Sequence, residues 1–175
     1  CRHTHPAADA LQRLLAAHAL RAGAVRRVSA RVHQAAIDVL GPVTDPQTVH
    51  QSKFSMGTVL AIIALHGRAG LAEFDAHYQD PAVAAFRDKV RMLADAEVEA
   101  AYPARWIARV EVETVDGRML LGRADEPKGD PGNTLSRAEI EDKALRLAAY
   151  RGGASAAEMR RVIELEWGME KAELV

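Results

Sequence analysis

The spacing of apolar residues changes several times along the chain, and each change marks a new predicted element. Between residues 6 and 21 apolar positions recur every three or four residues, which predicts an amphipathic helix with Pro6 in its first turn and Gly23 closing it. Between residues 25 and 33 apolar and polar residues alternate, which predicts a half-buried strand. The chain therefore begins with a helix followed by a strand.

The middle of the chain contains its most apolar segment. Residues 54–65 are apolar almost all round and too long for an ordinary strand, which predicts a buried helix. A shorter helix is expected after Asp80, with Asp80 as its cap and Pro81 in its first turn. Its predicted apolar stripe consists of Val83, Phe86, Val90 and Leu93.

The last third combines a hairpin with two helices. Residues 106–123 alternate around an Asp116-Gly117 turn, which predicts a β-hairpin. Two capping boxes, Ser136 with Glu139 and Ser155 with Glu158, each predict the start of a helix. The whole order predicts an α+β fold, with a small, mainly antiparallel sheet and helices on one face.

Composition narrows the classes of protein that fit this pattern. Hydrophobic residues make up 49% of the 175 residues, enough for a buried core, and the formal net charge of −1 argues against nucleic acid as the main partner. The longest apolar run, VLAIIAL, is far shorter than the roughly 20 residues that span a bilayer. A single cysteine and no recognisable signal peptide favour a cytoplasmic protein.

The segment CRHTHPAADA is the first candidate for chemistry. If the helix begins at Pro6, His5 lies at its N-cap, where unpaired N–H groups and the helix dipole attract anions. An imidazole there is shifted towards its neutral, proton-accepting form, and a carboxylate substrate would also fit. The alternatives are that His3 and His5 are solvated terminal histidines, or that they bind zinc, for which no further ligand motif is present.

Two further segments could contribute to a site. Lys53 and Ser55 precede the buried helix and could converge on a carboxylate, or serve as a snorkelling lysine and a capping region with Ser52 as the cap. Lys128 and Asp130 lie in a loop rich in glycine and proline that is expected to be a rigid connection. The spacing of the other histidines, His33, His50, His66 and His77 among them, predicts no metal site, and no nucleotide-binding motif is present.

Four segments together resemble the C-terminal part of the MmgE/PrpD family, which includes 2-methylcitrate dehydratase, cis-aconitate decarboxylase and iminodisuccinate epimerase. They are CRHTHPAADAL, QSKFSMGTVLAIIALHGRAGL, VETVDGRMLLGRADEPKGDPGNTLS and the helix that follows. The resemblance implies that residues 1–130 form the small α+β lid domain. Residues 131–175 would be helices that join an N-terminal helical domain lying outside this chain, so Cys1 would mark only where this piece of sequence begins.

The resemblance also implies a site between the two domains. His5 matches the family's acid/base or substrate-orienting histidine, and Arg2 and His3 would assist it electrostatically. Lys53 and Ser55 match the family's KFS segment and would line the same cleft. The sequence NTLS replaces the family's NPLS, which affects the rigidity of the loop more than the chemistry.

The family's reactions act on small di- or tricarboxylates and need no cofactor or metal, and its members are homodimers. The resemblance therefore implies a hydro-lyase of the 2-methylcitrate dehydratase type, with an epimerase or a decarboxylase as alternatives. Two other hypotheses come from the residues: a non-catalytic lid or dimerisation module, and a zinc-dependent hydrolase using His3 and His5, for which the ligand set is incomplete.

Overall fold

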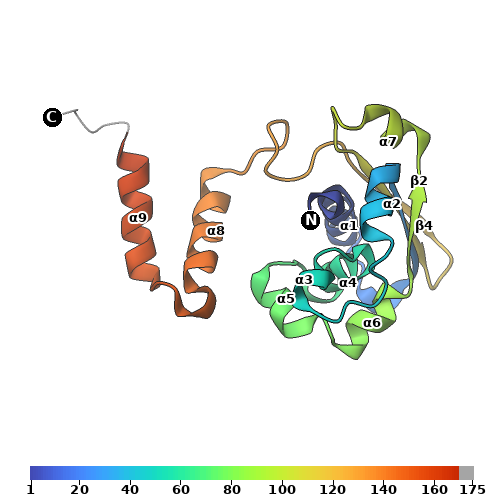
Figure 1. The fold of residues 1–175 in the computed structure, drawn as a ribbon, viewed down its shortest axis with the longest axis horizontal. Helices are drawn as coiled ribbons and strands as arrows, with labels where there is room; N and C mark the ends of the chain where they lie inside the picture. The colour runs from blue at the N-terminus through green and yellow to red at the C-terminus, as the bar shows by residue number, and fades with distance from the viewer. Residues whose placement is uncertain (170–175) are drawn as a thin grey trace. The chain divides into compact units, whose positions relative to one another are not determined.

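A computed structural model describes residues 1–169 and divides the chain into two compact units (Figure 1). The first unit is Cys1–Asn133 and the second is Thr134–Val175. Each unit is described by itself below.

The first unit combines short helices with a four-stranded sheet. Its helical elements are η1 (Arg2–Thr4), α1 (His5–Ala17), η2 (Ala22–Ala24), α2 (Gln34–Leu40), α3 (Val49–Ser52), α4 (Met56–His66), α5 (Leu71–His77), α6 (Pro81–Arg87) and α7 (Ala96–Ala101). Its strands are β1 (Val25–Val32), β2 (Val90–Ala94), β3 (Ala108–Thr114) and β4 (Met119–Ala124). The α+β prediction is therefore confirmed.

The sheet has the strand order β2-β1-β3-β4 and is mostly antiparallel. β1 pairs in parallel with β2, and β1 with β3 and β3 with β4 pair antiparallel. Val28 lies at the centre of this sheet, opposite Val90 on one side and Val112 on the other, and all three are buried. The opposite face is polar, because alternate residues carry ion pairs such as Arg31–Glu111 at 2.5 Å.

Helices α1 and α4 cover the apolar face of the sheet (Figure 1). α4 is buried along most of its length, as its all-round apolar sequence predicts, and Leu60, Ala61 and Ile62 have no exposed surface. α1 lies close against β4 because Gly122 has no side chain: a Cβ there would lie 2.9 Å from the carbonyl oxygen of Ala10. The predicted first helix, first strand and hairpin all occur in this unit.

Two boundaries predicted from the sequence are wrong. α1 ends at Ala17 rather than near Arg21, because Ala19 adopts a left-handed conformation and the Leu20 N–H bonds back to the Leu15 carbonyl at 2.9 Å. The helix after Asp80 ends at Arg87, and Val90 belongs to β2 instead of a helical stripe. Pairing with β1 buries Val90 in the sheet and overrides the helical spacing. The short helices α2 and α7 were not predicted.

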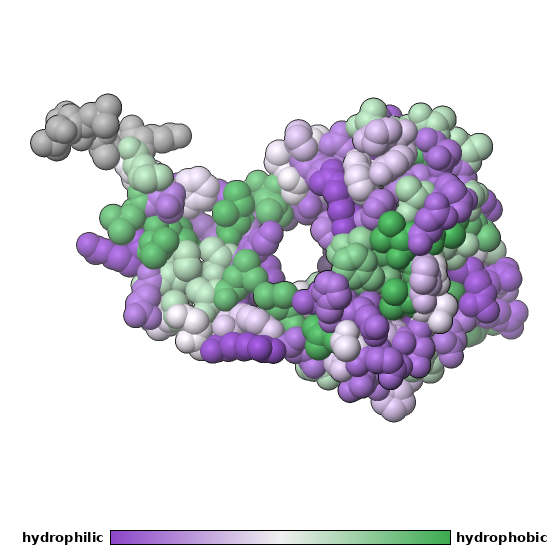
Figure 2. Space-filling model, in the orientation of Figure 1, coloured by the Kyte–Doolittle hydropathy of each residue, from purple (hydrophilic) through white to green (hydrophobic). Residues whose placement is uncertain are grey.

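The second unit is a pair of helices, α8 (Arg137–Ala149) and α9 (Ala156–Gly168), joined through η3 (Tyr150–Gly152). Both capping boxes form as predicted: the Ser136 and Ser155 hydroxyls accept backbone N–H groups three residues on, and Glu139 and Glu158 bond back to them. No residue between 134 and 169 is buried. Apolar residues gather on the surface of this pair in Figure 2.

None of the helices formed by residues 1–169 is long and apolar enough to cross a membrane, in keeping with the shortness of the VLAIIAL run.

Candidate functional site

The candidate site begins where η1 runs directly into α1. The helix starts at His5, one residue earlier than the sequence indicated, and Thr4 occupies the N-cap position without a capping side-chain bond. The N–H groups of Thr4 and His5 bond to the carbonyls of Cys1 and Arg2, and Pro6 has no N–H. The N–H groups of Thr4 and His5 are therefore not free to bind an anion, while the positive end of the helix dipole still attracts one.

The His5 side chain is exposed at the first turn of α1. Protein atoms around the ring desolvate it, and this burial is the main cause that lowers its pKa, while the positive charge of Arg2 makes a smaller contribution in the same direction. The carboxylates of Asp9 and Asp130 oppose this shift without reversing it. His5 is thus held towards its neutral form, in which a ring nitrogen can accept a proton.

Arg2 is fixed from two sides. Its guanidinium donates to the Asp130 carboxylate at 2.6 Å and lies 4.6 Å from the centre of the Trp106 ring. The same loop is attached to α1 by a bond from the Lys128 N–H to the Asp9 carboxylate. These contacts hold the 125–133 loop against α1 and beside η1.

His3 contacts a second histidine that comes from the end of β1. His33 caps α2, since its Nδ1 accepts the Ala36 N–H at 3.2 Å, so the proton of a neutral His33 ring must lie on Nε2. That Nε2 lies 3.4 Å from Nδ1 of His3 and can donate to it. His3 then carries its own proton on Nε2, as a hydrogen-bond donor. Burial lowers the pKa of both rings.

Aromatic rings enclose this histidine pair. Tyr102 stacks on His33 with ring centres 3.8 Å apart, and Trp106 lies 5.1 Å from His3. Tyr102 and Trp106 also meet each other edge to face at 5.3 Å. Residues from η1, β1 and the segment before β3 therefore form one cluster around His3.

Lys53 and Ser55 have different surroundings. The Lys53 ammonium lies 5.9 Å from the centre of the Phe74 ring of α5. Ser55 is buried and caps α4: its hydroxyl oxygen accepts from the N–H and the hydroxyl of Thr58, at 3.4 and 3.1 Å. The cap is thus Ser55 and not Ser52, whose hydroxyl donates to the Val49 carbonyl within α3.

The sequence profile of the MmgE/PrpD C-terminal domain matches residues 1–169, nearly the whole chain. The chain belongs to the MmgE/PrpD family. This confirms the resemblance expected from the sequence, including the C-terminal position of the piece within the family. Among proteins of curated function, none matches the chain. Family membership makes an enzymatic role possible, and the choice of reaction and substrate depends on the site.

Three members of the cluster in this MmgE/PrpD domain were not predicted as site residues: His33, Tyr102 and Trp106. Nothing in the thirty-residue separation of His3 and His33 indicates a contact. Their positions next to predicted strands could have indicated that they lie close together, since His33 follows β1 directly and Trp106 comes shortly before β3. Antiparallel pairing of these strands sets the end of one beside the start of the other.

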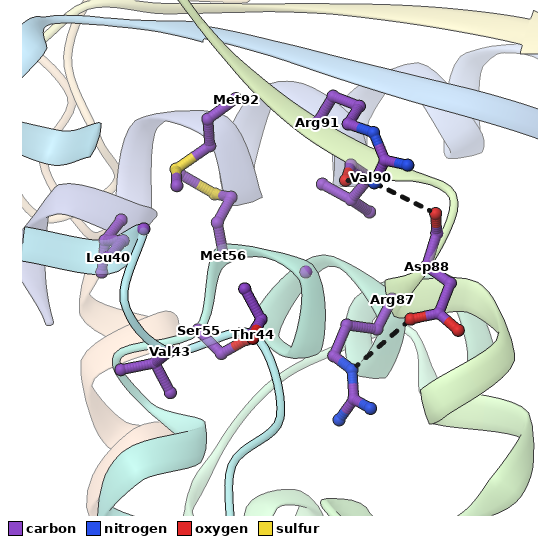
Figure 3. A pocket seen from close by; sticks show the side chains of 12 residues that line it. Leu40, Val43, Thr44, Ser55, Met56, Arg87, Asp88, Val90, Arg91 and Met92 are labelled. Carbon is purple, nitrogen blue, oxygen red and sulfur yellow. Dashed lines mark hydrogen bonds and ion pairs between the residues drawn. The ribbon is translucent and has the colours of Figure 1, made fainter. Parts of the chain in front are cut away.

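The MmgE/PrpD domain also has a pocket of about 130 Å³ at the start of α4 (Figure 3). Met56, Met92, Arg87 and Ser55 are among its lining residues, and His3 and His5 are not. Arg87 pairs with Asp45 at 3.0 Å, while its buried Nε has no hydrogen-bond partner. Ser55 therefore lines a pocket whose lining does not include His3 or His5, and its hydrogen bonds are those of a helix cap.

Proposed function

We propose that this MmgE/PrpD domain supplies His5 as an acid/base group to a cofactor-independent lyase that dehydrates a small di- or tricarboxylate, with 2-methylcitrate as the reference substrate. The observation that carries the proposal is the exposed His5 imidazole, whose pKa is lowered at the first turn of α1. Such a ring is reachable by substrate and able to take a proton at neutral pH. The other acid/base groups would come from a helical domain in the remainder of the protein.

The proposed step is proton abstraction next to a carboxylate. Neutral His5 takes the proton from carbon, the electron pair forms the alkene, and the hydroxyl leaves as water after a second acid has protonated it. The positive end of the α1 dipole stabilises the negative charge that develops on the substrate carboxylate. Lys53 would add to this, as the resemblance to the family implies. His3, as an Nε2–H donor, would orient a substrate oxygen.

Arg2 has a different part in the proposal. Its charge is already balanced by Asp130 at 2.6 Å, so it adds less net attraction for an anion than an unpaired arginine would. Stacked on Trp106, it holds the loop and the aromatic cluster in place around His3 and His5. Arg2 would therefore act mainly by positioning, and Ser55 by capping α4.

Three alternatives use the same residues or the exposed surface of the second unit. An epimerase would return the proton to the opposite face, and a decarboxylase would protonate the carbanion left after loss of carbon dioxide. A non-catalytic lid or dimerisation module is favoured by the second unit, where Ile140, Leu147, Val162 and Leu165 are exposed. In the first two cases His5 is still needed for the reaction, and in the third it is not.

One experiment separates these reactions. The full protein, with its helical domain, is incubated in D₂O with 2-methylcitrate or citrate and followed by proton NMR. A dehydratase gives an alkene signal, an epimerase exchanges the carbon-bound proton for deuterium, and a decarboxylase loses a carboxyl group with deuterium uptake.

His5→Ala is compared with His18→Ala, an exposed histidine at the far end of the same helix. We expect alkene formation to fall at least about a hundredfold in His5→Ala, within the usual contribution of general acid–base catalysis, and to be unchanged in His18→Ala. Alkene formation that is equal in the two variants would exclude His5 from the chemistry. Absence of any reaction with the unsubstituted protein would favour the non-catalytic module.

A further inference from the structure

Three potential metal ligands converge at one side of the first unit, away from the residues considered so far. They are His66, the last residue of α4, His77, the last residue of α5, and Asp80, which directly precedes α6. Each offers one ligand atom, and these atoms all lie within 4.8 Å of one another. The two imidazole rings stack with their centres 3.8 Å apart, and His77 Nδ1 lies 2.8 Å from Asp80 Oδ2.

The backbone explains why these side chains meet. Gly67 ends α4 in a left-handed conformation immediately after His66, and the chain returns through the seven-residue α5 to place His77 on the His66 ring. Asp80 stands at the N-cap of α6, where the sequence predicts a capping carboxylate. Its side chain makes no capping bond and turns to His77 instead. The Asp80 carboxylate therefore contacts His77 and leaves the first turn of α6 without a side-chain cap.

The electrostatic setting also favours a cation. His66 and His77 both lie at C-terminal ends of helices, where the dipole is negative. Asp80 adds a formal negative charge, and its side chain is 44% exposed, so an ion could reach it from solvent. Protein ligands of one zinc ion are roughly 3.3 Å apart when each bond is about 2.1 Å long, so the ligand atoms need to approach by up to about 1.5 Å. The two stacked imidazole rings must also rotate so that a nitrogen of each faces the ion.

We propose that His66, His77 and Asp80 form a binding site for one divalent transition-metal ion of the zinc class, with water completing the coordination. Two imidazoles and a carboxylate suit Zn²⁺ better than Mg²⁺ or Ca²⁺, which prefer oxygen ligands. A metal ion at this site would link α4, α5 and the start of α6. The stability of α5 would increase most, because Phe74 is the one buried residue among its seven.

The test uses Zn²⁺ alone as the probe on chelator-treated protein. Isothermal titration, repeated in competition with a chromophoric chelator, should show one equivalent bound at this site, and thermal unfolding should shift to higher temperature with added Zn²⁺. Co²⁺ in place of Zn²⁺ should give visible absorption bands that report the ligand set. These readouts do not depend on enzymatic activity.

Variants test whether the one bound Zn²⁺ ion occupies the site formed by His66, His77 and Asp80. His66→Ala, His77→Ala and Asp80→Asn should each raise the Kd for Zn²⁺ at this site at least about tenfold. Each should also reduce the rise in unfolding temperature that added Zn²⁺ causes. His18→Ala is the matched control, and His3→Ala separates any binding at the other histidine pair. Since His66 is exposed, loss of binding in His66→Ala with an unchanged circular dichroism spectrum is not a folding effect. Equal Zn²⁺ affinity in His18→Ala and in a His66→Ala/His77→Ala double variant would overturn the proposal.

Discussion

The two units of the chain use the same signals for local structure but differ in what their helices bury. α4 of the first unit and α8 and α9 of the second all start at a serine that caps the first turn. α4 buries seven of its eleven residues, whereas α8 and α9 bury none. The sequence already indicates this difference, because α4 is apolar almost all round whereas α8 and α9 carry many charged residues.

The comparison shows that capping fixes where a helix starts, while burial decides how much it adds to stability. Isolated helices of about a dozen residues are marginal in water, so most helical stability must come from packing. α4 has that packing within its own unit. The exposed apolar residues of α8 and α9 have no such packing within their own unit, and the proposed helical domain would cover them.

The largest expected effect comes from truncating a leucine in each unit. Leu60 has no exposed surface, so Leu60→Ala should lower the free energy of unfolding of the first unit by about 2–5 kcal/mol. Leu165 is 60% exposed, and Leu165→Ala should change stability by less than about 0.5 kcal/mol. Urea unfolding followed by circular dichroism measures both. A cost at Leu165 similar to that at Leu60 would show that the second unit has a core of its own.

Replacing one glycine in each unit with alanine should change stability in opposite directions. Gly122→Ala places a methyl group 2.9 Å from the Ala10 carbonyl oxygen, so α1 must shift from β4, at a cost of about 1–3 kcal/mol. Nothing lies within 4 Å of a Cβ at Gly168 in α9, and Gly168→Ala should stabilise that helix by up to about 1 kcal/mol. Thermal unfolding checks the first and helical content the second. Destabilisation by Gly168→Ala would contradict the open surroundings described for α9.

The smallest effect is a dependence on pH in the range where histidines titrate, which only the first unit should show. Burial lowers the pKa of His3, His5 and His33, while residues 134–175 contain no histidine. Below about pH 6.5 the unfolded chain binds protons that the folded histidines resist, so stability falls as the pH is lowered and is unaffected above that range. Urea unfolding at several pH values measures the slope of the free energy of unfolding against pH. This slope should be smaller in His33→Gln and unchanged in His18→Ala. An unchanged slope in His33→Gln would remove His33 from this explanation.

The fold was predictable where local spacing and tertiary packing agree. α1, β1, α4, the hairpin and both capping boxes follow directly from periodicity and turn residues. β2 was not predictable, since Val90 fits a helical stripe and becomes a strand residue only through its pairing with β1. Asp80 is a similar case, because its position predicts a cap and its contact with His77 prevents one.

The candidate site was predictable only in part. The family resemblance selected His5, Arg2, His3, Lys53 and Ser55, and the structure gathers Arg2 and His3 with His33, Tyr102 and Trp106. Contacts between residues thirty or more positions apart depend on strand pairing, which spacing along the chain does not contain. His66 and His77 are only eleven positions apart, but they meet through the turn at Gly67 and the length of α5, which their spacing alone does not indicate.

The two tryptophans give each unit its own optical reporter. Trp106 lies under the Arg2 guanidinium in the histidine cluster, and Trp167 lies under Arg137 in the helical pair, with 4.8 Å between the Arg137 guanidinium and the ring centre. These are the two tryptophans of the chain, so replacing Trp167 with phenylalanine leaves fluorescence from the cluster alone. Emission from that variant would follow the surroundings of His3 in real time, and the reciprocal variant would report when a partner covers α8 and α9.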